Sequence, residues 1–321
     1  MHINKFDYYK RLTPQMRDVV DYVKKWNAEH PATADYRQDY LDERIFWNEG
    51  GPTPAKVVES TVEGPNGPIP VRLHYPTVSD KPMGVTIYFH GGSLMLGNND
   101  THSRVMRMFA EESNTVVIGV DYRLAPEYKF PSWIDEGVAV VRHFHQHGAE
   151  FNLDPNDIAL CGDSAGAYMS LSIALYLRDH DKDISYLRSL ILYYGIYGMR
   201  DSKSFRQWGN DVDAIMREDS TTLYSTSTLA SEQDAFSPYY DLLASDLTHD
   251  IPPCFICCGE ADPLLDNSTL LYEVLHDKEM PCELKLYPGV MHAFIHYSRM
   301  MDDAANALHL GGRYVREHGK H

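Results

Sequence analysis

The sequence predicts an α/β fold in which a mostly parallel central sheet is flanked by helices. Three observations lead to this prediction. Short apolar runs alternate with helix-compatible segments from residue 71 onward. Several of these runs are apolar at nearly every position, which is typical of central strands that are covered on both faces. The chain has 321 residues, which is enough for one large core with an appended subdomain.

Residues 1–50 predict two helices before the sheet begins. The dipeptide Thr13-Pro14 is typical of a helix start, and apolar side chains then recur at helical spacing as far as Trp26. We expect Thr33 to cap a second helix, which the run Gly50-Gly51-Pro52 would end. The segment 1–50 is therefore predicted to be a helical cap.

The rest of the chain supplies the strands and the helices that connect them. The predicted strands are 71–75, 84–89, 116–120, 158–161, 190–194, 254–258 and a last one around 284–286. The predicted helices between them are 104–112, 134–145, 167–178 and 268–275. Because strands that alternate with helices are joined by crossover connections, most of them should run parallel.

One stretch interrupts this alternation. Residues 197–237 include Trp208, polar side chains and helix-compatible segments, but no clear apolar strand. We expect this stretch to be an insertion that joins the segment 1–50 in covering the edge of the sheet where the strands end. Ligands bind at that edge in open parallel sheets. The predicted core then consists of residues 51–196 and 238–321.

Charge and hydropathy exclude several classes of function. The formal net charge of −17 repels phosphate backbones and anionic lipid, so we expect no nucleic-acid partner and no membrane partner. No run approaches the roughly 18 apolar residues of a membrane span. Residues 1–7 lack the apolar region of a signal peptide. The expected location is therefore the cytoplasm.

Cysteine and histidine patterns predict no metal site. The five cysteines are Cys161, Cys254, Cys257, Cys258 and Cys282. Their odd number, and the apolar runs that contain four of them, favour buried thiols over disulfides. Cys254 and Cys257 form a CxxC, but no second pair or nearby histidine completes a zinc site. His143, His145 and His147 likewise have no obvious further ligand.

A Gly-x-Ser-x-Gly motif gives the first indication of chemistry. The segment Gly162-Asp163-Ser164-Ala165-Gly166 follows an apolar strand and precedes a predicted helix. In this context the serine lies on a sharp strand-to-helix turn, where the flanking glycines leave room for a strained backbone. The helix N-terminus favours developing negative charge. We interpret Ser164 as a nucleophile; the alternative is a glycine-rich structural turn.

A serine hydroxyl needs a base to take its proton. In serine hydrolases built on such a sheet, an acid and then a histidine follow the serine along the chain. Asp262 comes directly after an apolar strand, with Glu260 and Asp266 as rivals for the acid. His292 follows the last predicted strand, with His296 as the alternative base. We expect His292 to act as the base and Asp262 to orient it.

Glycines after an early strand predict donors for an oxyanion. The segment His90-Gly91-Gly92-Ser93 follows the strand 84–89. Ester cleavage needs N–H groups that point at the tetrahedral oxygen, and glycines allow the backbone to turn inward. We expect the N–H groups of Gly91, Gly92 and Ala165 to be these donors, with His90 as part of the motif. The alternative is a simple turn at the end of the strand.

Taken in order, these motifs resemble the hormone-sensitive-lipase family of α/β-hydrolase esterases. The resemblance depends on His90-Gly91-Gly92, on Asp-Tyr-Arg-Leu-Ala-Pro-Glu at 121–127, on the Gly-Asp-Ser-Ala-Gly turn at 162–166, on Asp262-Pro263-Leu264 and on His292-Ala293-Phe294. Within the family, the chain is most similar to bacterial cytoplasmic acetyl esterases. The similarity covers nearly the whole chain, including the N-terminal helices.

The resemblance implies an α/β-hydrolase fold with a helical cap and no cofactor. It implies hydrolysis of short-chain acyl esters, from acetyl to about octanoyl, through an acyl-enzyme intermediate. The residues it assigns are Ser164, His292 and Asp262 as the triad and Gly91, Gly92 and Ala165 as oxyanion donors. Ser93 stands where the family usually has a third glycine, which leaves the loop conformation and the acyl pocket open.

Two other functions remain as alternatives. The chain could act mainly as a binding protein, since relatives of the acetyl-esterase type are associated with restraining a maltose-gene activator. The same triad could instead cleave an amide or a peptide. The expected partner is a small-molecule ester. A regulatory protein such as a maltose-gene activator is expected from the resemblance alone, and a homodimer remains open.

Overall fold

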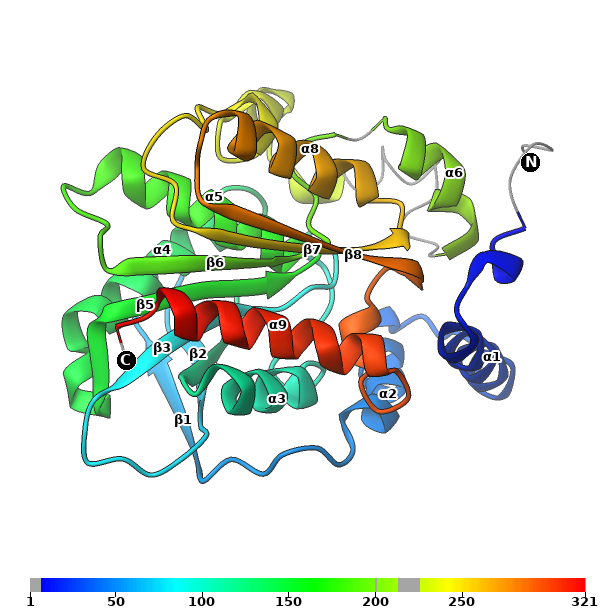
Figure 1. The fold of residues 1–321 in the computed structure, drawn as a ribbon, viewed down its shortest axis with the longest axis horizontal. Coiled ribbons are helices and arrows are strands. Elements are labelled where there is room, and N and C mark those ends of the chain that lie inside the picture. Colours follow the sequence, from blue (N-terminus) through cyan, green and yellow to red (C-terminus); the bar gives the residue numbers. More distant parts are fainter. Residues whose placement is uncertain (1–6, 200, 213–225, 321) are drawn as a thin grey trace.

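The computed structural model describes residues 7–199, 201–212 and 226–320, and its centre is a single sheet (Figure 1). In these residues the sheet has eight strands. They are β1 (Lys56–Val62), β2 (Ile69–Tyr75), β3 (Met83–Phe89), β4 (Val116–Val120), β5 (Leu153–Asp163), β6 (Leu187–Tyr193), β7 (Cys254–Ala261) and β8 (Cys282–Met291).

The strands lie in the order β1-β2-β4-β3-β5-β6-β7-β8. Strands β3 to β8 run parallel, whereas β2 pairs antiparallel with both β1 and β4. The prediction of a mostly parallel sheet is therefore confirmed. Edge strand β1 has no counterpart among the predicted strands, because only Val62 of its seven residues is buried and its sequence contains no buried apolar run.

Helices cover both faces of the sheet (Figure 1). Helices α4 (Ser132–His147), α5 (Ala165–His180) and α8 (Leu265–Asp277) pack on one face, and α3 (Ser103–Ser113) and α9 (Asp302–His318) pack on the other. Helix α9 was given no range from the sequence, where Gly311 and Gly312 lower helix propensity. The apolar layers on both faces fix the sheet in place. They thereby fix the position of the edge at which the strands end.

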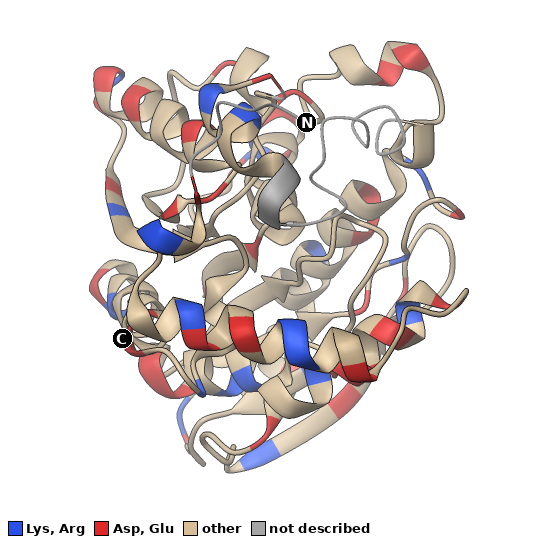
Figure 2. Cartoon of the chain, turned by 90° about the vertical axis from the view of Figure 1, so that its right-hand side faces the viewer, with Lys and Arg blue, Asp and Glu red and all other residues tan. Residues whose placement is uncertain are grey.

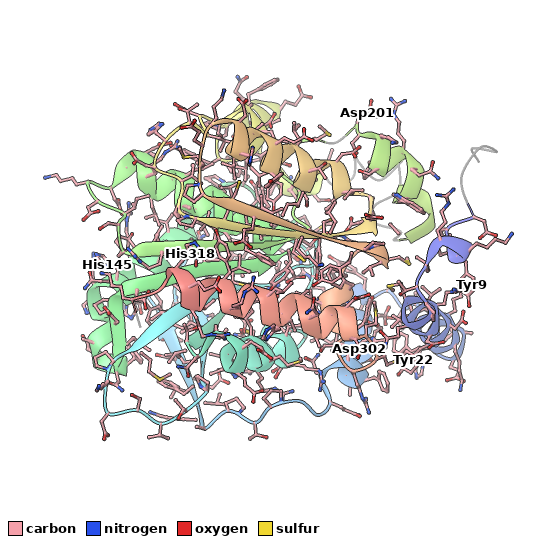
Figure 3. All side chains as sticks on the ribbon, viewed as in Figure 1. Tyr9, Tyr22, His145, Asp201, Asp302 and His318 are labelled. Atoms are coloured by element: carbon pink, nitrogen blue, oxygen red, sulfur yellow. The ribbon has the colours of Figure 1, made fainter. Side chains whose placement is uncertain are left out.

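The carboxyl ends of the strands point toward α1 (Pro14–Glu29), α2 (Tyr36–Asn48) and α6 (Lys203–Val212), as the arrowheads of β7 and β8 show in Figure 1. Tyr9 and Tyr22 lie at this end and His145 lies at the opposite end (Figure 3). The described residues of 197–237 contain α6 and a short 3-10 helix, Glu232–Phe236, and no strand, as predicted.

The two N-terminal helices begin at different kinds of cap. The hydroxyl of Thr13 accepts a hydrogen bond from the N–H of Met16 (3.2 Å), which confirms the predicted start of α1. The prediction that Thr33 caps α2 is wrong. The carboxylate of Asp35 caps this helix by accepting from Gln38 N–H (3.0 Å), because Asp35 directly precedes the first helical residue.

Arg37 anchors α2 to the core. Its guanidinium donates to the carbonyl oxygens of Met95 (3.0 Å) and Ala125 (2.8 Å). It also donates to both oxygens of Glu127, at 3.1 and 2.7 Å. A planar guanidinium suits such a fork of acceptors. One side chain thus joins the N-terminal segment to two loops at the carboxyl edge of the sheet.

We expect Arg37→Ala to lower the free energy of unfolding by about 2 kcal/mol, since it removes two hydrogen bonds from a charged donor to backbone carbonyls. Glu127→Gln is the matched control. It should cost less than about 1 kcal/mol, because this ion pair is largely exposed. Urea unfolding measures both values. Equal losses would show that the exposed ion pair, rather than the two carbonyl contacts, anchors the helix.

The surface helices at the carboxyl edge carry acidic and basic residues interspersed with each other (Figure 2). Ion pairs form between elements distant in sequence, as between Arg299 and Glu49 (2.8 Å). Within the described ranges, no helix combines the length and the apolar character needed to cross a bilayer.

Candidate active site

Two of the predicted motifs meet at the carboxyl edge because their strands are neighbours. Strand β3 ends at Phe89, beside Gly162 near the end of β5. The connections from β3 lead to β4 on one side, while β5 lies on the other. Such a reversal of strand order opens a crevice in which ligands bind. The loop that begins at His90 and the turn at Ser164 therefore lie side by side.

Ser164 occupies the strained turn that its motif predicts. It lies between β5 and α5 with φ 52° and ψ −116°. A non-glycine residue with such a backbone costs on the order of 1–3 kcal/mol. Its N–H donates to the carbonyl of Tyr193 (2.8 Å), which helps to hold the turn. A Cβ at Gly162 or Gly166 would overlap neighbouring backbone, so both glycines are needed for the close approach.

Ser164, His292 and Asp262 form one hydrogen-bonded chain. The imidazole Nε2 of His292 lies 3.1 Å from Ser164 Oγ, and its Nδ1 lies 2.8 Å from Asp262 Oδ2. A carboxylate oxygen can only accept, so Nδ1 carries the proton. This tautomer leaves the Nε2 lone pair free to accept the hydroxyl proton of Ser164. The geometry is that of a nucleophile, a base and a group that orients the base.

The rival acids point elsewhere. Asp262 is fully buried, and its second oxygen accepts from the N–H of Leu264 (2.7 Å). Glu260 is exposed at the end of β7. Asp266 accepts from the N–H of Ser204 (2.8 Å), which connects α8 with the start of α6. Exposure to solvent accounts for Glu260, and capping of the start of α6 accounts for Asp266.

The alternative base, His296, also points away from the serine. It lies in the 3-10 helix Phe294–Tyr297 with its Nε2 3.4 Å from Asp163 Oδ2. Burial, together with nearby Arg44 and His102, lowers the pKa of His296 to about 3, so its imidazole is neutral. His296 therefore faces the carboxylate of Asp163, the residue directly before Ser164.

In the loop after β3, one of the N–H groups predicted as oxyanion donors already has a protein acceptor. The N–H of Gly91 donates to Asp163 Oδ1 (2.9 Å). In this structure the N–H of Gly91 therefore already has an acceptor, and its role as an oxyanion donor stays a prediction. In the described residues, the N–H groups of Gly92 and Ser93 have no protein acceptor, and Ala165 begins α5, where helical N–H groups are unpaired.

Ser93 adopts the left-handed conformation that a third glycine would adopt easily. Its φ is 57°, and the φ of Gly92 is 115°. Glycine tolerates such angles without strain, whereas serine does so at a cost. Serine in place of the family's usual third glycine therefore still leaves a backbone N–H at position 93.

His90 holds the start of the loop that follows β3. Its ring stacks on Tyr122 at 4.3 Å, and its Nδ1 lies 2.8 Å from the carbonyl of Gly91. Burial lowers the pKa of His90 to about 3. A neutral ring must then donate from Nδ1 to this carbonyl, because a carbonyl only accepts. The hydroxyl of Tyr122 donates to the carbonyl of His90 (2.7 Å), so the start of the loop is held at several points.

The cysteine pair and the histidines considered above as metal ligands do not have the arrangement that a metal site requires. Cys254 and Cys257 are buried on opposite faces of the sheet, in different apolar clusters, so the CxxC cannot hold one ion. His145 contacts the carbonyl of Pro155 (2.8 Å) and lies at the end of the molecule opposite Tyr9 and Tyr22 (Figure 3).

One buried cluster was not found from the sequence. His102, Asp163 and His296 place possible ligand atoms within 4.8 Å of one another, the one such group of three in the described residues. Asp163 Oδ1 already accepts from Gly91 N–H and from the hydroxyl of Tyr88 (2.7 Å). The one signal in the sequence is the aspartate itself, at the variable position directly before the serine.

Comparison with known proteins agrees with this architecture. The family model described as alpha/beta hydrolase fold matches residues 86–296. The chain is 42% identical to the acetyl esterase of Salmonella choleraesuis (strain SC-B67) over 314 residues, which are 97% of this chain and 96% of that protein. The acetyl esterase of Salmonella typhi has the same identity and coverage.

A solved structure shows the same fold. The esterase of Pyrobaculum calidifontis is 25% identical, with a TM-score of 0.87, and the alignment covers 95% of this chain and 98% of that one. The family match runs from strand β3 past His292, and the acetyl esterases match almost from end to end. The chain therefore belongs to the α/β-hydrolase family, in its hormone-sensitive-lipase-like group of esterases.

Proposed function

We propose that this carboxylesterase cleaves short-chain acyl esters, from acetyl to about octanoyl, through an acyl-enzyme on Ser164. The observation that carries the proposal is the chain from Ser164 Oγ to His292 Nε2 (3.1 Å) and from His292 Nδ1 to Asp262 (2.8 Å). The preference for short acyl groups is supported by relatives named acetyl esterase that match 97% of this chain at 42% identity.

In the first step, His292 takes the hydroxyl proton as Ser164 attacks the ester carbonyl. Asp262 keeps the proton on Nδ1 and stabilises the imidazolium that forms. The negative oxygen then accepts from backbone N–H groups, for which Gly92, Ser93 and Ala165 are the candidates. Donors of this kind are fixed before the reaction, so they need no reorganisation in the transition state.

The tetrahedral intermediate then collapses. His292 gives its proton to the departing alcohol, and the acyl group remains on Ser164 Oγ. A water molecule enters, His292 removes one of its protons, and the resulting attack forms a second tetrahedral intermediate. Its collapse returns the proton to Ser164 and releases the carboxylic acid. No step in this cycle needs a group beyond the side chains and backbone named here.

A series of 4-nitrophenyl esters from acetate to palmitate tests the acyl preference. Each methylene buried in a pocket contributes about 0.8 kcal/mol, or roughly a fourfold gain in kcat/KM, until the pocket is full. We expect the maximum between acetyl and octanoyl, followed by a fall. A maximum at decanoyl or longer would contradict the short-chain proposal. Ser164→Ala, measured in parallel, gives the background rate.

A further inference from the structure

We propose that Tyr194 is a positioning residue for the reaction, whose buried ring packs against the imidazole of His292 and keeps it aligned with Ser164. The proposal rests on the proposed function. Tyr194 is fully buried, and none of the chemical steps above uses it. The centre of its ring lies 4.9 Å from that of His292, with the two ring planes at 64°. Aromatic rings at such a distance and angle attract each other.

Tyr194 directly follows β6, the strand that lies between β5 and β7. Strand β5 leads to Ser164 and β7 leads to Asp262, so Tyr194 emerges between them at the carboxyl edge of the sheet. The peptide group before Tyr194 is held from both sides. The carbonyl of Tyr193 accepts from Ser164 N–H (2.8 Å), and the N–H of Tyr194 donates to the carbonyl of Cys257 (2.6 Å). The position of Tyr194 is therefore tied to the turn that carries the nucleophile.

The backbone of Tyr194 is strained. Its φ of 41° lies in the left-handed region, which is unfavourable for a residue with a bulky side chain. Strain of this kind persists where the surrounding structure holds a residue in place, and such residues cluster at active sites. Because φ helps to set the direction of the Cβ, this angle is part of what places the ring against His292.

The hydrogen bonds of His292 leave one motion of the imidazole unrestrained. They engage Nδ1 (2.8 Å) and Nε2 (3.1 Å), on opposite sides of the ring. Two such contacts still allow the imidazole to tilt about the line that joins its nitrogens, and a bulky ring packed beside it limits this tilt. Tyr194 also contacts Phe294, two residues further along the chain, with ring centres 5.6 Å apart. It therefore restrains both the imidazole and the turn that follows it.

The ring of Tyr194, and not its hydroxyl, is the part that can act on His292. In the residues that the structure describes, this hydroxyl is buried without a hydrogen-bond partner. Burial, together with the nearby carboxylates of Asp163 and Asp262, raises the pKa of the phenol far above its usual range. The hydroxyl therefore stays protonated and does not serve as a base. Removing it should cost nothing, because a buried hydroxyl without a partner is itself unfavourable.

The test compares Tyr194→Leu with Tyr314→Leu. Tyr314 is a buried tyrosine of α9 whose ring packs against Phe255 (5.7 Å). Both substitutions remove a buried ring and lower stability. We expect Tyr194→Leu to lower kcat for a short acyl ester by about tenfold with KM changed less than about twofold, since an aromatic pair contributes a factor of this order. Tyr314→Leu should leave both kinetic constants unchanged.

Two further variants and a spectroscopic measurement separate positioning from loss of structure. Tyr194→Phe keeps the ring and should restore kcat to within about twofold of wild type. Tyr194→Met fills the space with a flexible chain, so its kcat should stay as low as that of Tyr194→Leu, and it decides the test if the leucine variant does not fold. The proton NMR signal of His292 Nδ1–H reports the 2.8 Å contact with Asp262. It should broaden or shift in the leucine and methionine variants and stay in place in Tyr194→Phe and Tyr314→Leu.

Several results would overturn the proposal. These are a kcat within about twofold of wild type in folded Tyr194→Leu or Tyr194→Met, a rise in KM alone, or an unchanged signal of the His292 proton in both variants. A loss in Tyr194→Phe as large as that in Tyr194→Leu would also overturn it, because the hydroxyl would then be the group that acts. Ser164→Ala separates the two levels of argument. If that variant is inactive while Tyr194→Met is fully active, the inference fails and the proposed function stands.

Discussion

Ser164→Ala should lower kcat for a short acyl ester by about 10⁶-fold, the loss typical of removing the nucleophile from a triad. The reason is geometric. The hydroxyl oxygen of Ser164 lies 3.1 Å from His292 Nε2, the nitrogen that can take its proton. Without it, the base and the oxyanion donors have no attacking group to act on. Steady-state hydrolysis of 4-nitrophenyl acetate measures the loss.

The matched control is Ser172→Ala. Ser172 lies on α5, two turns beyond the nucleophile, and its buried hydroxyl donates to the carbonyl of Tyr239 (2.7 Å). Its removal should lower stability by about 1 kcal/mol and leave kcat unchanged. A fluorophosphonate should label the wild type and the Ser172→Ala variant at Ser164. Substantial turnover by Ser164→Ala, or labelling of that variant, would reject the acyl-enzyme mechanism.

The central strands could be predicted because burial on both faces leaves a clear signal. All seven residues of β3 and all five of β4 are buried, and both appear in the sequence as nearly continuous apolar runs. The edge of the sheet gives no such signal. Strand β1 faces solvent over most of its length, so its residues are not constrained to be apolar. Prediction from apolar runs therefore finds the core and misses the edge.

The meeting of Ser164, His292 and Asp262 was predictable for a different reason. Chain order, together with the position of Asp262 and His292 after strands, brings both to the carboxyl edge wherever the strands are parallel. Hydrogen-bond details within that edge depend on tertiary contacts instead. The contact between Gly91 N–H and Asp163 joins residues 72 apart in the chain. A glycine-rich loop predicts that the backbone turns, but it does not predict which N–H group already donates to another residue.

The wrong cap predicted for α2, Thr33 in place of Asp35, shows the same limit on a smaller scale. Both are good helix caps, and the sequence offers no local reason to prefer either. In the structure, the hydroxyl and the N–H of Thr33 donate to Asp39, at 2.8 and 2.7 Å. The helix start is therefore fixed two residues later. Helix-start signals that lie close together predict that a helix is present, but they do not predict at which residue it begins.

Asp262→Asn should lower kcat by about 10⁴-fold while leaving the fold intact, because the substitution changes the tautomer of His292. Asp262 Oδ1 accepts from the N–H of Leu264 (2.7 Å), and this contact will hold the remaining carbonyl oxygen of the amide on that side. The amide NH₂ then faces His292 Nδ1 and donates to it. The imidazole proton moves to Nε2, where it blocks acceptance of the Ser164 proton.

The rival acid supplies the control for this experiment. Glu260→Gln removes an exposed carboxylate two residues away and should leave kcat within about twofold of wild type. Thermal unfolding of both variants checks that the comparison is between folded proteins. An equal loss of kcat in Glu260→Gln would show that the orienting role had been assigned to the wrong carboxylate. A loss confined to Asp262→Asn would mean that the 2.8 Å contact to His292 Nδ1 sets the tautomer on which proton transfer from Ser164 depends.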